Sequence, residues 1–252
     1  MRISIETNFP DVAARIVQFG KQGRFAAAVA LTRTAQLDVK PAIKKEMSRA
    51  FDRPTAYTLN STVTKRATKD NLEARVWLKD DIYAKGTPAD RYLAPQIFGG
   101  ERRQKGLERA LQAARLMPPG YVAVPAVGAQ LDGNGNVKRS QIVQILSQLR
   151  LQRGAGYESR RTGSARSNRT IARQGVTYFA VPTTTRGLQP GVYLKRQFAG
   201  GSAVKPVFVF ARRAVYRPIL KFFEVGEQVA RRRFPDHFNS ELVKAIASAR
   251  LT

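Results

Sequence analysis

The sequence contains no cysteine, and this absence excludes disulfides, zinc sites with cysteine ligands and catalysis by a thiol. A chain without cysteine is compatible with synthesis in a reducing cytosol. Histidine is almost as scarce. Because His237 is the only one, a multi-histidine metal site is excluded, and a Ser-His-Asp triad would depend on this residue. No run of roughly 18 apolar residues occurs, so we expect no membrane-spanning helix.

Acidic residues are few, whereas basic residues are abundant. The 252 residues include 44 lysines and arginines against 18 aspartates and glutamates, a formal net charge of +26. Such a charge attracts polyanions and opposes self-association, so the natural partners are nucleic acid, an anionic membrane or acidic protein surfaces. A hydrophobic fraction of 43% is sufficient for a core, and the length allows one large domain or two small ones.

The charge is unevenly distributed along the chain. Between Arg150 and Arg217 there are fourteen basic residues and one acidic residue, Glu158, whereas the rest of the chain has thirty basic and seventeen acidic residues. The most electropositive part of the sequence therefore lies in this segment.

The pattern of apolar residues predicts an α+β fold with long N-terminal helices, antiparallel hairpins and a C-terminal helix pair. Strands grouped in hairpins favour α+β over a parallel, doubly wound sheet. Helices are predicted at 9–51 (with a kink or restart at Pro41), 101–117, 141–151, 216–234 and 238–251. Strands are predicted at 3–7, 56–67, 72–80, 121–127, 176–182, 187–197 and 204–211. The stretch 80–106 is predicted to be irregular, and its last six residues overlap the start of the helix predicted at 101–117.

We interpret these elements as one domain in three parts: 1–150, a basic arm at 151–175, and 176–252. The arm includes the stretch ESRRTGSARSNRTIARQG, which is rich in Ser, Gly and Arg. We expect it to be exposed and to become ordered against an adjacent subunit. Since Tyr157 is its one aromatic residue, backbone electrostatics or a protein partner is favoured over base stacking. Its candidate contact residues are Arg160, Arg161, Arg166, Arg169 and Arg173.

A second arginine cluster, Arg231, Arg232 and Arg233, is placed by the pattern at the end of a helix. Cations at that position complement the helix dipole, which gives the cluster a structural role. Contact with an acidic partner surface or with phosphate is an equally weighted alternative, and both remain open at this point.

The remaining candidates for chemistry favour structural roles. The segment D-G-N-G-N at Asp132 has some features of a calcium loop, but Val143 occupies the twelfth position where an acidic ligand is required, so we predict a turn. The carboxylates are scattered, unlike those of a metal-dependent nuclease. His237 reads as an inter-helix contact or cap. We therefore expect no catalytic residues, no cofactor and no metal, and a protein that is not an enzyme.

Several motifs resemble tailed-bacteriophage structural proteins. AAAVALTRTAQLDVKPAIKKEM is similar to the start of the minor tail protein Z (tail completion) family, in which A-L-N-R-T-A is common, although Thr32 replaces the asparagine here. YLAPQIFGGERRQKGLERAL is similar to a segment of phage neck and tail genes. The C-terminal pattern combines a strand ending in V-P, then GLQPGVYLK, a K-P-V strand and Tyr216-Arg217-Pro218.

This resemblance implies a structural protein of the head–tail junction (neck) or tail. It implies assembly as a homo-oligomeric ring in tail completion or head–tail joining, beside portal, adaptor or tail-tube and terminator proteins, with possible contact to packaged DNA. The implied location is the virion, and the host cytoplasm during assembly. In this family reading Gly187, Pro190 and Gly191 shape the turn before a strand, and Lys205-Pro206 lies in an edge strand or at the first position of a strand, where proline is tolerated. The alternative is a sequence-independent nucleic-acid-binding protein.

Overall fold

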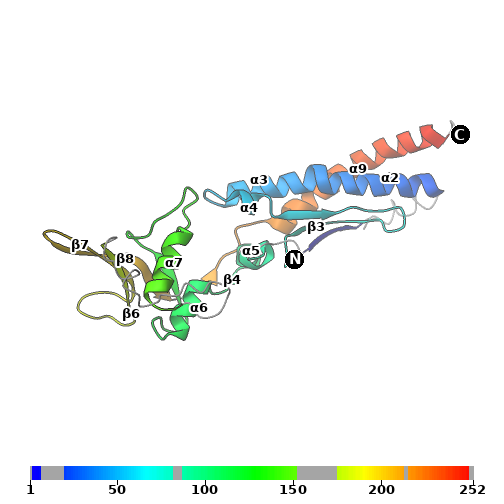
Figure 1. The fold of residues 1–252 in the computed structure, drawn as a ribbon. Helices are drawn as coiled ribbons and strands as arrows, with labels where there is room; N and C mark the ends of the chain where they lie inside the picture. Colours follow the sequence, from blue (N-terminus) through cyan, green and yellow to red (C-terminus); the bar gives the residue numbers. More distant parts are fainter. Residues whose placement is uncertain (1, 7–19, 82–86, 152–174, 213–214, 250–252) are drawn as a thin grey trace. The chain divides into compact units, whose positions relative to one another are not determined.

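The computed structural model describes residues 2–6, 20–81, 87–151, 175–212 and 215–249 (Figure 1). They form two compact units: Met1–Arg102 with Tyr216–Thr252, and Arg103–Val215. Helices and antiparallel sheets occur in both units, which confirms the predicted α+β class. The unit boundaries differ from the predicted single domain divided at residues 150 and 175, because the second unit begins near residue 103 and both ends of the chain belong to the first. The predicted arm lies largely outside the described residues.

The first unit is built on one continuous N-terminal helix. It comprises α2 (Gly20–Arg33), a π-helical segment η1 (Thr34–Val39) and α3 (Lys40–Ala50). Pro41 lies in the first turn of α3 and does not interrupt the helix, although the sequence predicted a kink or restart there. Proline has no N–H to donate backwards along the helix, and the wider π-helical turn lies directly before it.

Helix α9 (Phe222–Ala249) packs along this N-terminal helix (Figure 1). The sequence predicted a helix pair with a break between Phe234 and Phe238, but the structure has one helix that contains Pro235. Phe234 and Phe238 are buried, and their rings stack at 5.8 Å. The facing side of α2 is lined by small, fully buried residues, Ala26, Ala27 and Ala30, which allow the two helices to approach closely.

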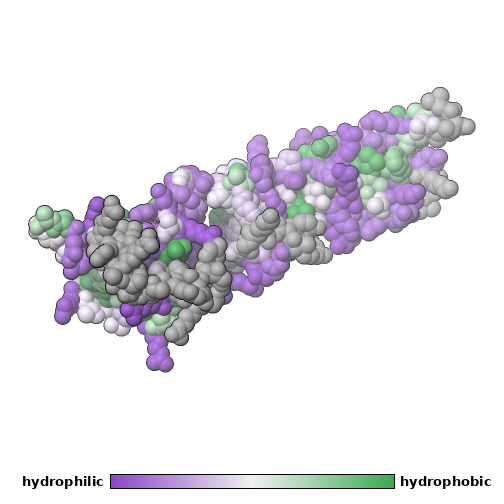
Figure 2. All heavy atoms as spheres, viewed as in Figure 1, coloured by the Kyte–Doolittle hydropathy of each residue, from purple (hydrophilic) through white to green (hydrophobic). Residues whose placement is uncertain are grey.

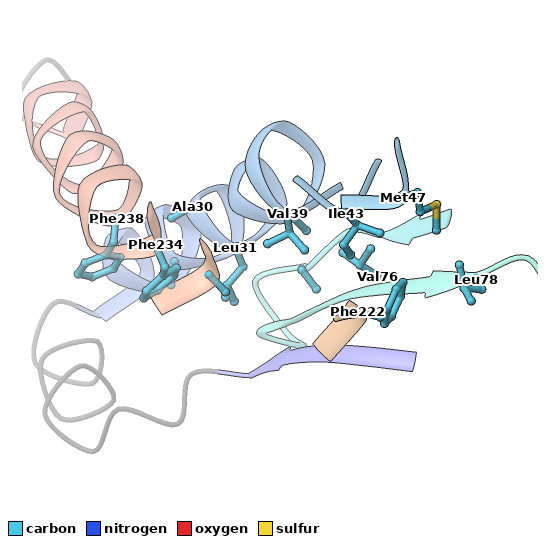
Figure 3. Close-up of a cluster of buried hydrophobic side chains, with 14 of the residues drawn as sticks. Ala30, Leu31, Val39, Ile43, Met47, Val76, Leu78, Phe222, Phe234 and Phe238 are labelled. Carbon is cyan, nitrogen blue, oxygen red and sulfur yellow. The ribbon is translucent and has the colours of Figure 1, made fainter. Parts of the chain in front are cut away.

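A three-stranded antiparallel sheet completes the first unit. Its order is β1 (Arg2–Glu6), β3 (Glu73–Leu78) and β2 (Thr62–Lys65). Ala74, Val76 and Leu78 face the core and are fully buried, as the alternation predicted. Trp77, predicted on the opposite face, is also buried. Figure 3 shows side chains of the N-terminal helix, β3 and α9 meeting in one core.

Two short helices were missed by the sequence analysis. The predicted strand at 56–67 begins instead with α4 (Ala56–Leu59), and Thr55 caps this helix by accepting the Thr58 N–H at 3.2 Å. The stretch predicted as irregular contains α5 (Ala89–Phe98), whose Leu93 and Ile97 join the core.

The chain passes between the two units at β4 (Gly100–Glu101) and β9 (Val215–Tyr216), which pair with each other. The predicted helix at 216–234 would place Pro218 in its first turn, but α9 begins only at Phe222. The N–H groups of Ile219 and Leu220 donate to the Gln96 carbonyl at 2.8 and 2.9 Å, which fixes this segment before α9 starts.

The second unit is a four-stranded antiparallel sheet covered by two helices. The strand order is β5 (Tyr121–Pro125), β8 (Gly201–Arg212), β7 (Gly191–Phe198) and β6 (Val176–Val181). Apolar side chains of α6 (Gly106–Ala113) and α7 (Arg139–Gln148) pack on one face of this sheet. Their core includes Leu111, Ile145, Val192, Val207 and Phe208.

Pro206 lies inside the interior strand β8, contrary to the expectation that Lys205-Pro206 lies in an edge strand or begins a strand. It opposes Tyr193 next to a β-bulge, where the local ladder is interrupted and a missing N–H is tolerated. The Pro206 carbonyl accepts the Gly128 N–H at 2.8 Å. A Cβ at Gly128 would lie 2.9 Å from that oxygen, so glycine is required for this close approach.

Candidate functional site

The arginine cluster predicted at a helix end lies in the middle of α9. The structure therefore contradicts the helix-dipole interpretation, since about four turns of helix follow Arg233. Arg231 pairs with Glu227 at 2.5 Å, and Arg233 pairs with Asp38 at 3.0 Å. Arg232 is exposed and makes no ion pair with any described residue. The five predicted arm residues, Arg160, Arg161, Arg166, Arg169 and Arg173, lie outside the described residues.

Asp38 is the centre of a polar contact between the π-helical segment and α9. Its Oδ1 accepts the Arg233 Nε–H at 3.0 Å, and its Oδ2 lies 2.7 Å from His237 Nε2. The hydrogen bond and the charge of Asp38 raise the pKa of the Arg233 guanidinium. His237 therefore makes the inter-helix contact predicted from the sequence. Asp38, Arg233 and His237 are thus bound to one another, and their contact holds the π-helical segment against α9.

A second polar contact joins the same two helices further along. Glu241 of α9 accepts hydrogen bonds from Arg33 of α2 at 3.0 Å and from Lys244 at 2.8 Å. The Lys244 hydrogen bond, followed by the charges of Lys244, Arg33 and His237, lowers the pKa of Glu241. Other ion pairs of the first unit include Arg49 with Glu46 and Arg75 with Glu73.

An open, mainly apolar groove of about 500 Å³ also lies in the first unit. Phe25 and Val29 of α2 form one wall, and residues 66–69 form the other. The walls are joined by hydrogen bonds from the Ala67 N–H to Thr32 Oγ1 at 3.1 Å and from Arg24 Nε to the Lys69 carbonyl at 2.9 Å. These contacts give the groove a fixed shape. Across the described part of the chain, no group of three or more His, Asp or Glu residues is placed to hold a metal ion.

The second unit has a different charge balance. Residues 103–215 contain 19 lysines and arginines and 3 acidic residues, whereas the rest of the chain contains 25 and 15. Its two described carboxylates both bind backbone N–H groups. Glu108, which is 1% exposed, accepts those of Lys105 at 2.7 Å and Ala123 at 3.0 Å, and Asp132 accepts those of Asn134 and Asn136 at 2.9 Å. The predicted turn at Asp132 is thereby confirmed.

Three cations of the second unit gather at one end of its sheet. Lys195 and Arg196 lie in the outer half of β7, and Lys205 lies in the adjoining part of β8. All three are exposed, and none makes an ion pair with a described residue. These three residues were not among the predicted contact residues. The sequence indicates a basic region by the scarcity of acidic residues from Arg150 to Arg217, but the register of β7 and β8 is needed to show that the three cations lie close together.

Glutamines connect α7 to the sheet, and the sequence analysis missed them as well. Gln148 bonds the edge strand β6 as another strand would: its Oε1 accepts the Tyr178 N–H at 2.7 Å, and its Nε2 donates to the Val176 carbonyl at 3.3 Å. Gln141, which is 1% exposed, accepts the Gln130 N–H at 2.7 Å and donates to the Gly128 carbonyl at 2.9 Å. These contacts fix the helix on the sheet and occupy part of the open edge.

Comparisons of the chain with protein-family models, with curated proteins and with solved structures found no match. Among the described helices, none is both long enough and apolar enough to span a bilayer.

Proposed function

We propose that this chain is a structural protein of a tailed-bacteriophage neck or tail, which assembles as a homo-oligomeric ring in tail completion or head–tail joining. The observation that carries the proposal is the contrast between the two units. Residues 103–215 contain 19 basic and 3 acidic residues, against 25 and 15 in the rest of the chain. In the second unit Lys195, Arg196 and Lys205 are exposed and make no ion pair with a described residue. A ring subunit of this kind uses a stable framework together with a surface that binds acidic neighbours or DNA.

The motifs that suggested this class fold into regular elements, which also supports the proposal. The opening motif forms the continuous N-terminal helix, and YLAPQIFGG forms α5 and the turn after it. In the C-terminal motif, Gly191 lies where a Cβ would be 2.3 Å from the Phe208 carbonyl oxygen. Its glycine therefore has a role in the fold, as expected for motifs that define an architecture.

The proposal is tested by mass spectrometry of purified virions of the phage whose genome carries this sequence. We expect the protein in intact particles, at several copies per portal ring. Electron microscopy of the purified protein mixed with the portal, adaptor or tail-terminator proteins of the same genome should then show rings. Absence from virions, together with the absence of assembly with these proteins, would contradict the proposal.

A nucleic-acid-binding protein that acts outside the virion is the second candidate. The exposed cations at the end of the second unit's sheet favour this function, because binding to a phosphate backbone requires positive charges but does not require contacts with the bases. The virion measurement separates the two functions, because a protein of this second kind is absent from purified particles.

A further inference from the structure

Helix α2 carries a second stripe of residues, distinct from the buried alanines that face α9. Its members recur at helical spacing and line the groove of the first unit: Phe25, Ala28, Val29, Thr32 and Arg33. Phe25 is 57% exposed, whereas Ala28 on the same stripe is almost fully buried. Figure 2 shows small apolar patches among hydrophilic side chains on the visible side of this unit. An aromatic ring this exposed, beside a groove, offers a partner both contact area and a place for an apolar side chain.

The opposite wall of the groove is the segment that follows β2. Residues 66–69 are tied to α2, where the Ala67 N–H donates to Thr32 Oγ1 at 3.1 Å and Arg24 Nε donates to the Lys69 carbonyl at 2.9 Å. Because both contacts use backbone groups of this segment, they leave its charged side chains available for a ligand. The groove is thus preformed, and a ligand would not have to order its walls.

Cations stand on both walls of the groove. Arg33 belongs to α2, and Arg66 and Lys69 belong to the opposite wall. Arg33 is already paired with Glu241 of α9, but Arg66 and Lys69 are exposed and make no ion pair with a described residue. Among the described residues that line the groove there is no carboxylate, and Asp70, the next residue along the chain, is not part of the lining. The groove therefore combines an apolar lining with positive charge on both sides.

We propose that this groove binds an amphipathic segment of an acidic partner protein. One or two large apolar side chains of that segment enter the groove against Phe25 and Val29, and flanking Asp or Glu residues pair with Arg66 and Lys69. Recognition of an amphipathic segment in a groove depends on apolar anchors of this kind, with charges around them. A volume of about 500 Å³ lies within the range of such binding sites. As the neighbour of a virion subunit this partner rests on the proposed function, but peptide binding is measured without virions.

The chemistry of the groove argues against other occupants. A phosphate backbone has no apolar surface to place against Phe25, so DNA would leave the apolar lining unfilled. A second copy of this chain would bring a net charge of +26 and few carboxylates to a positive groove. The groove is open to solvent and so does not enclose the alkyl chain of a fatty acid or lipid.

The first experiment selects ligands from a displayed library of random dodecapeptides on the immobilised full chain. We expect the recovered peptides to combine Asp or Glu with Leu, Phe or Trp, because the groove offers both positive charge and apolar surface. Recovery of no peptide above background would overturn the proposal. So would recovery of peptides that lack either the acidic or the large apolar residues.

The second experiment measures binding of a recovered peptide by fluorescence anisotropy to two full-chain variants of equal net charge. R66Q/K69Q removes two cations of the groove, and the control K45Q/R232Q removes two exposed cations of the first unit that lie outside it. We expect binding to R66Q/K69Q to be roughly three- to tenfold weaker than to the wild type, and binding to the control to be nearly unchanged. An equal loss in both variants would show attraction by the overall charge and not by the groove.

A second pair of variants tests the apolar wall. Phe25→Ala should weaken binding of the peptide about tenfold or more, because it removes the ring that the apolar anchor contacts. Leu37→Ala is the matched control, since Leu37 is 58% exposed but lies outside the groove, and it should bind as the wild type does. If the two substitutions had the same effect, Phe25 would have no part in binding.

A charge exchange protects the test against misfolding of the variants. R66E/K69E should lose the recovered peptide and should bind a version of it in which Lys replaces Asp and Glu, which an unfolded groove could not do. Failure of this exchange would contradict the assigned ion pairs. More effective displacement of the peptide by dodecanoate or by anionic vesicles than by the unlabelled peptide would assign the groove to a lipid instead. Self-association that Phe25→Ala abolishes would assign it to a second copy.

The failure of this inference and that of the proposed function are distinguishable. Peptide binding with the expected pattern by a protein that is absent from virions would retain the groove and reject the neck or tail role. Presence in virions, together with equal binding to each variant and its control, would do the reverse.

Discussion

His237 Nε2 lies 2.7 Å from Asp38 Oδ2, which joins the middle of α9 to the π-helical turn of the N-terminal helix. The same carboxylate accepts the Arg233 Nε–H at 3.0 Å, so one side chain of the π-helical segment serves two side chains of α9. A π-helical turn changes which residues face a neighbouring helix. Here it presents Asp38 to α9.

Asp38→Asn should destabilise the first unit by about 1–2 kcal/mol, because the amide removes the charge that pairs with Arg233 and keeps only one of the two oxygens that contact Arg233 and His237. The measurement is the free energy of unfolding from urea denaturation. The control is Asp52→Asn, whose carboxylate is 82% exposed and pairs with the adjacent Arg53, and whose effect should stay within about 0.5 kcal/mol. Equal effects of the two substitutions would contradict this role of Asp38.

Glu108→Ala should destabilise the second unit by about 2–3 kcal/mol. The buried carboxylate accepts the N–H groups of Lys105 and Ala123, and its removal leaves the Ala123 N–H without its partner. Thermal unfolding followed by circular dichroism measures the loss. Arg109→Ala, on the exposed side of the same helix, is the matched control and should change stability little.

Gly191→Ala should destabilise the second unit by about 3 kcal/mol or more, since its Cβ would lie 2.3 Å from the Phe208 carbonyl oxygen and the two strands would have to separate. Gly200→Ala is the control, because a Cβ there meets no atom within 4 Å. Denaturant midpoints of the two variants provide the comparison. A Gly191 variant as stable as the Gly200 variant would show that the β7–β8 approach is looser than described.

Gln148→Ala should expose the edge of β6, because the glutamine side chain occupies the Tyr178 N–H and the Val176 carbonyl. We expect a loss of about 1–2 kcal/mol in unfolding free energy and an increase in self-association through the freed edge. Light scattering at increasing protein concentration measures the association. Gln144→Ala, one turn earlier on α7 and bonded only to the Tyr178 hydroxyl at 3.4 Å, should associate no more than the wild type.

Glu46 makes stability depend on pH at acidic values. Hydrogen bonds from the Arg49 guanidinium, at 2.7 and 2.8 Å, lower the pKa of Glu46 in the folded state. A lowered folded pKa adds stability that is present above the unfolded value, near 4.5, and is lost as the pH falls through the folded value. Glu46→Gln should therefore cost roughly 0.5–1 kcal/mol near neutral pH and less in acid. A cost that is constant as the pH falls would contradict this.

The sequence was sufficient to predict the α+β class because the apolar periodicities are strong where burial is greatest. Ala74, Val76 and Leu78 alternate as a strand with one buried face requires, and the structure buries all three. Proline and glycine misled the interpretation elsewhere. The helix pair was predicted with a break at Pro235, but packing against the core outweighs the local cost of this proline. The turn signals Pro88 and Gly99 concealed α5, because they lie at its two ends.

The candidate site was less accessible to sequence reasoning because it depends on register and on contacts between distant residues. Arg233 and Asp38 are 195 positions apart, so their pairing has no local signal. Arg196 and Lys205 come onto one face through the β7–β8 ladder, whose register shifts at a bulge that the residue pattern does not predict. The basic character of the region could be predicted, but the positions of its charges on the two faces of the sheet could not.

The first unit is assembled from both ends of the described chain, with the second unit inserted between Arg102 and Tyr216. During synthesis, residues 103–215 therefore leave the ribosome before α9, and the second unit can fold while the first still lacks the helix that covers Ala26, Ala27 and Ala30. The helical unit closes only after α9 has been synthesised, because its contacts join residues separated by about 200 positions. Completion of the first unit thus follows synthesis of the second, and a nascent chain stalled before α9 would carry a folded basic sheet together with an apolar helix that lacks its cover.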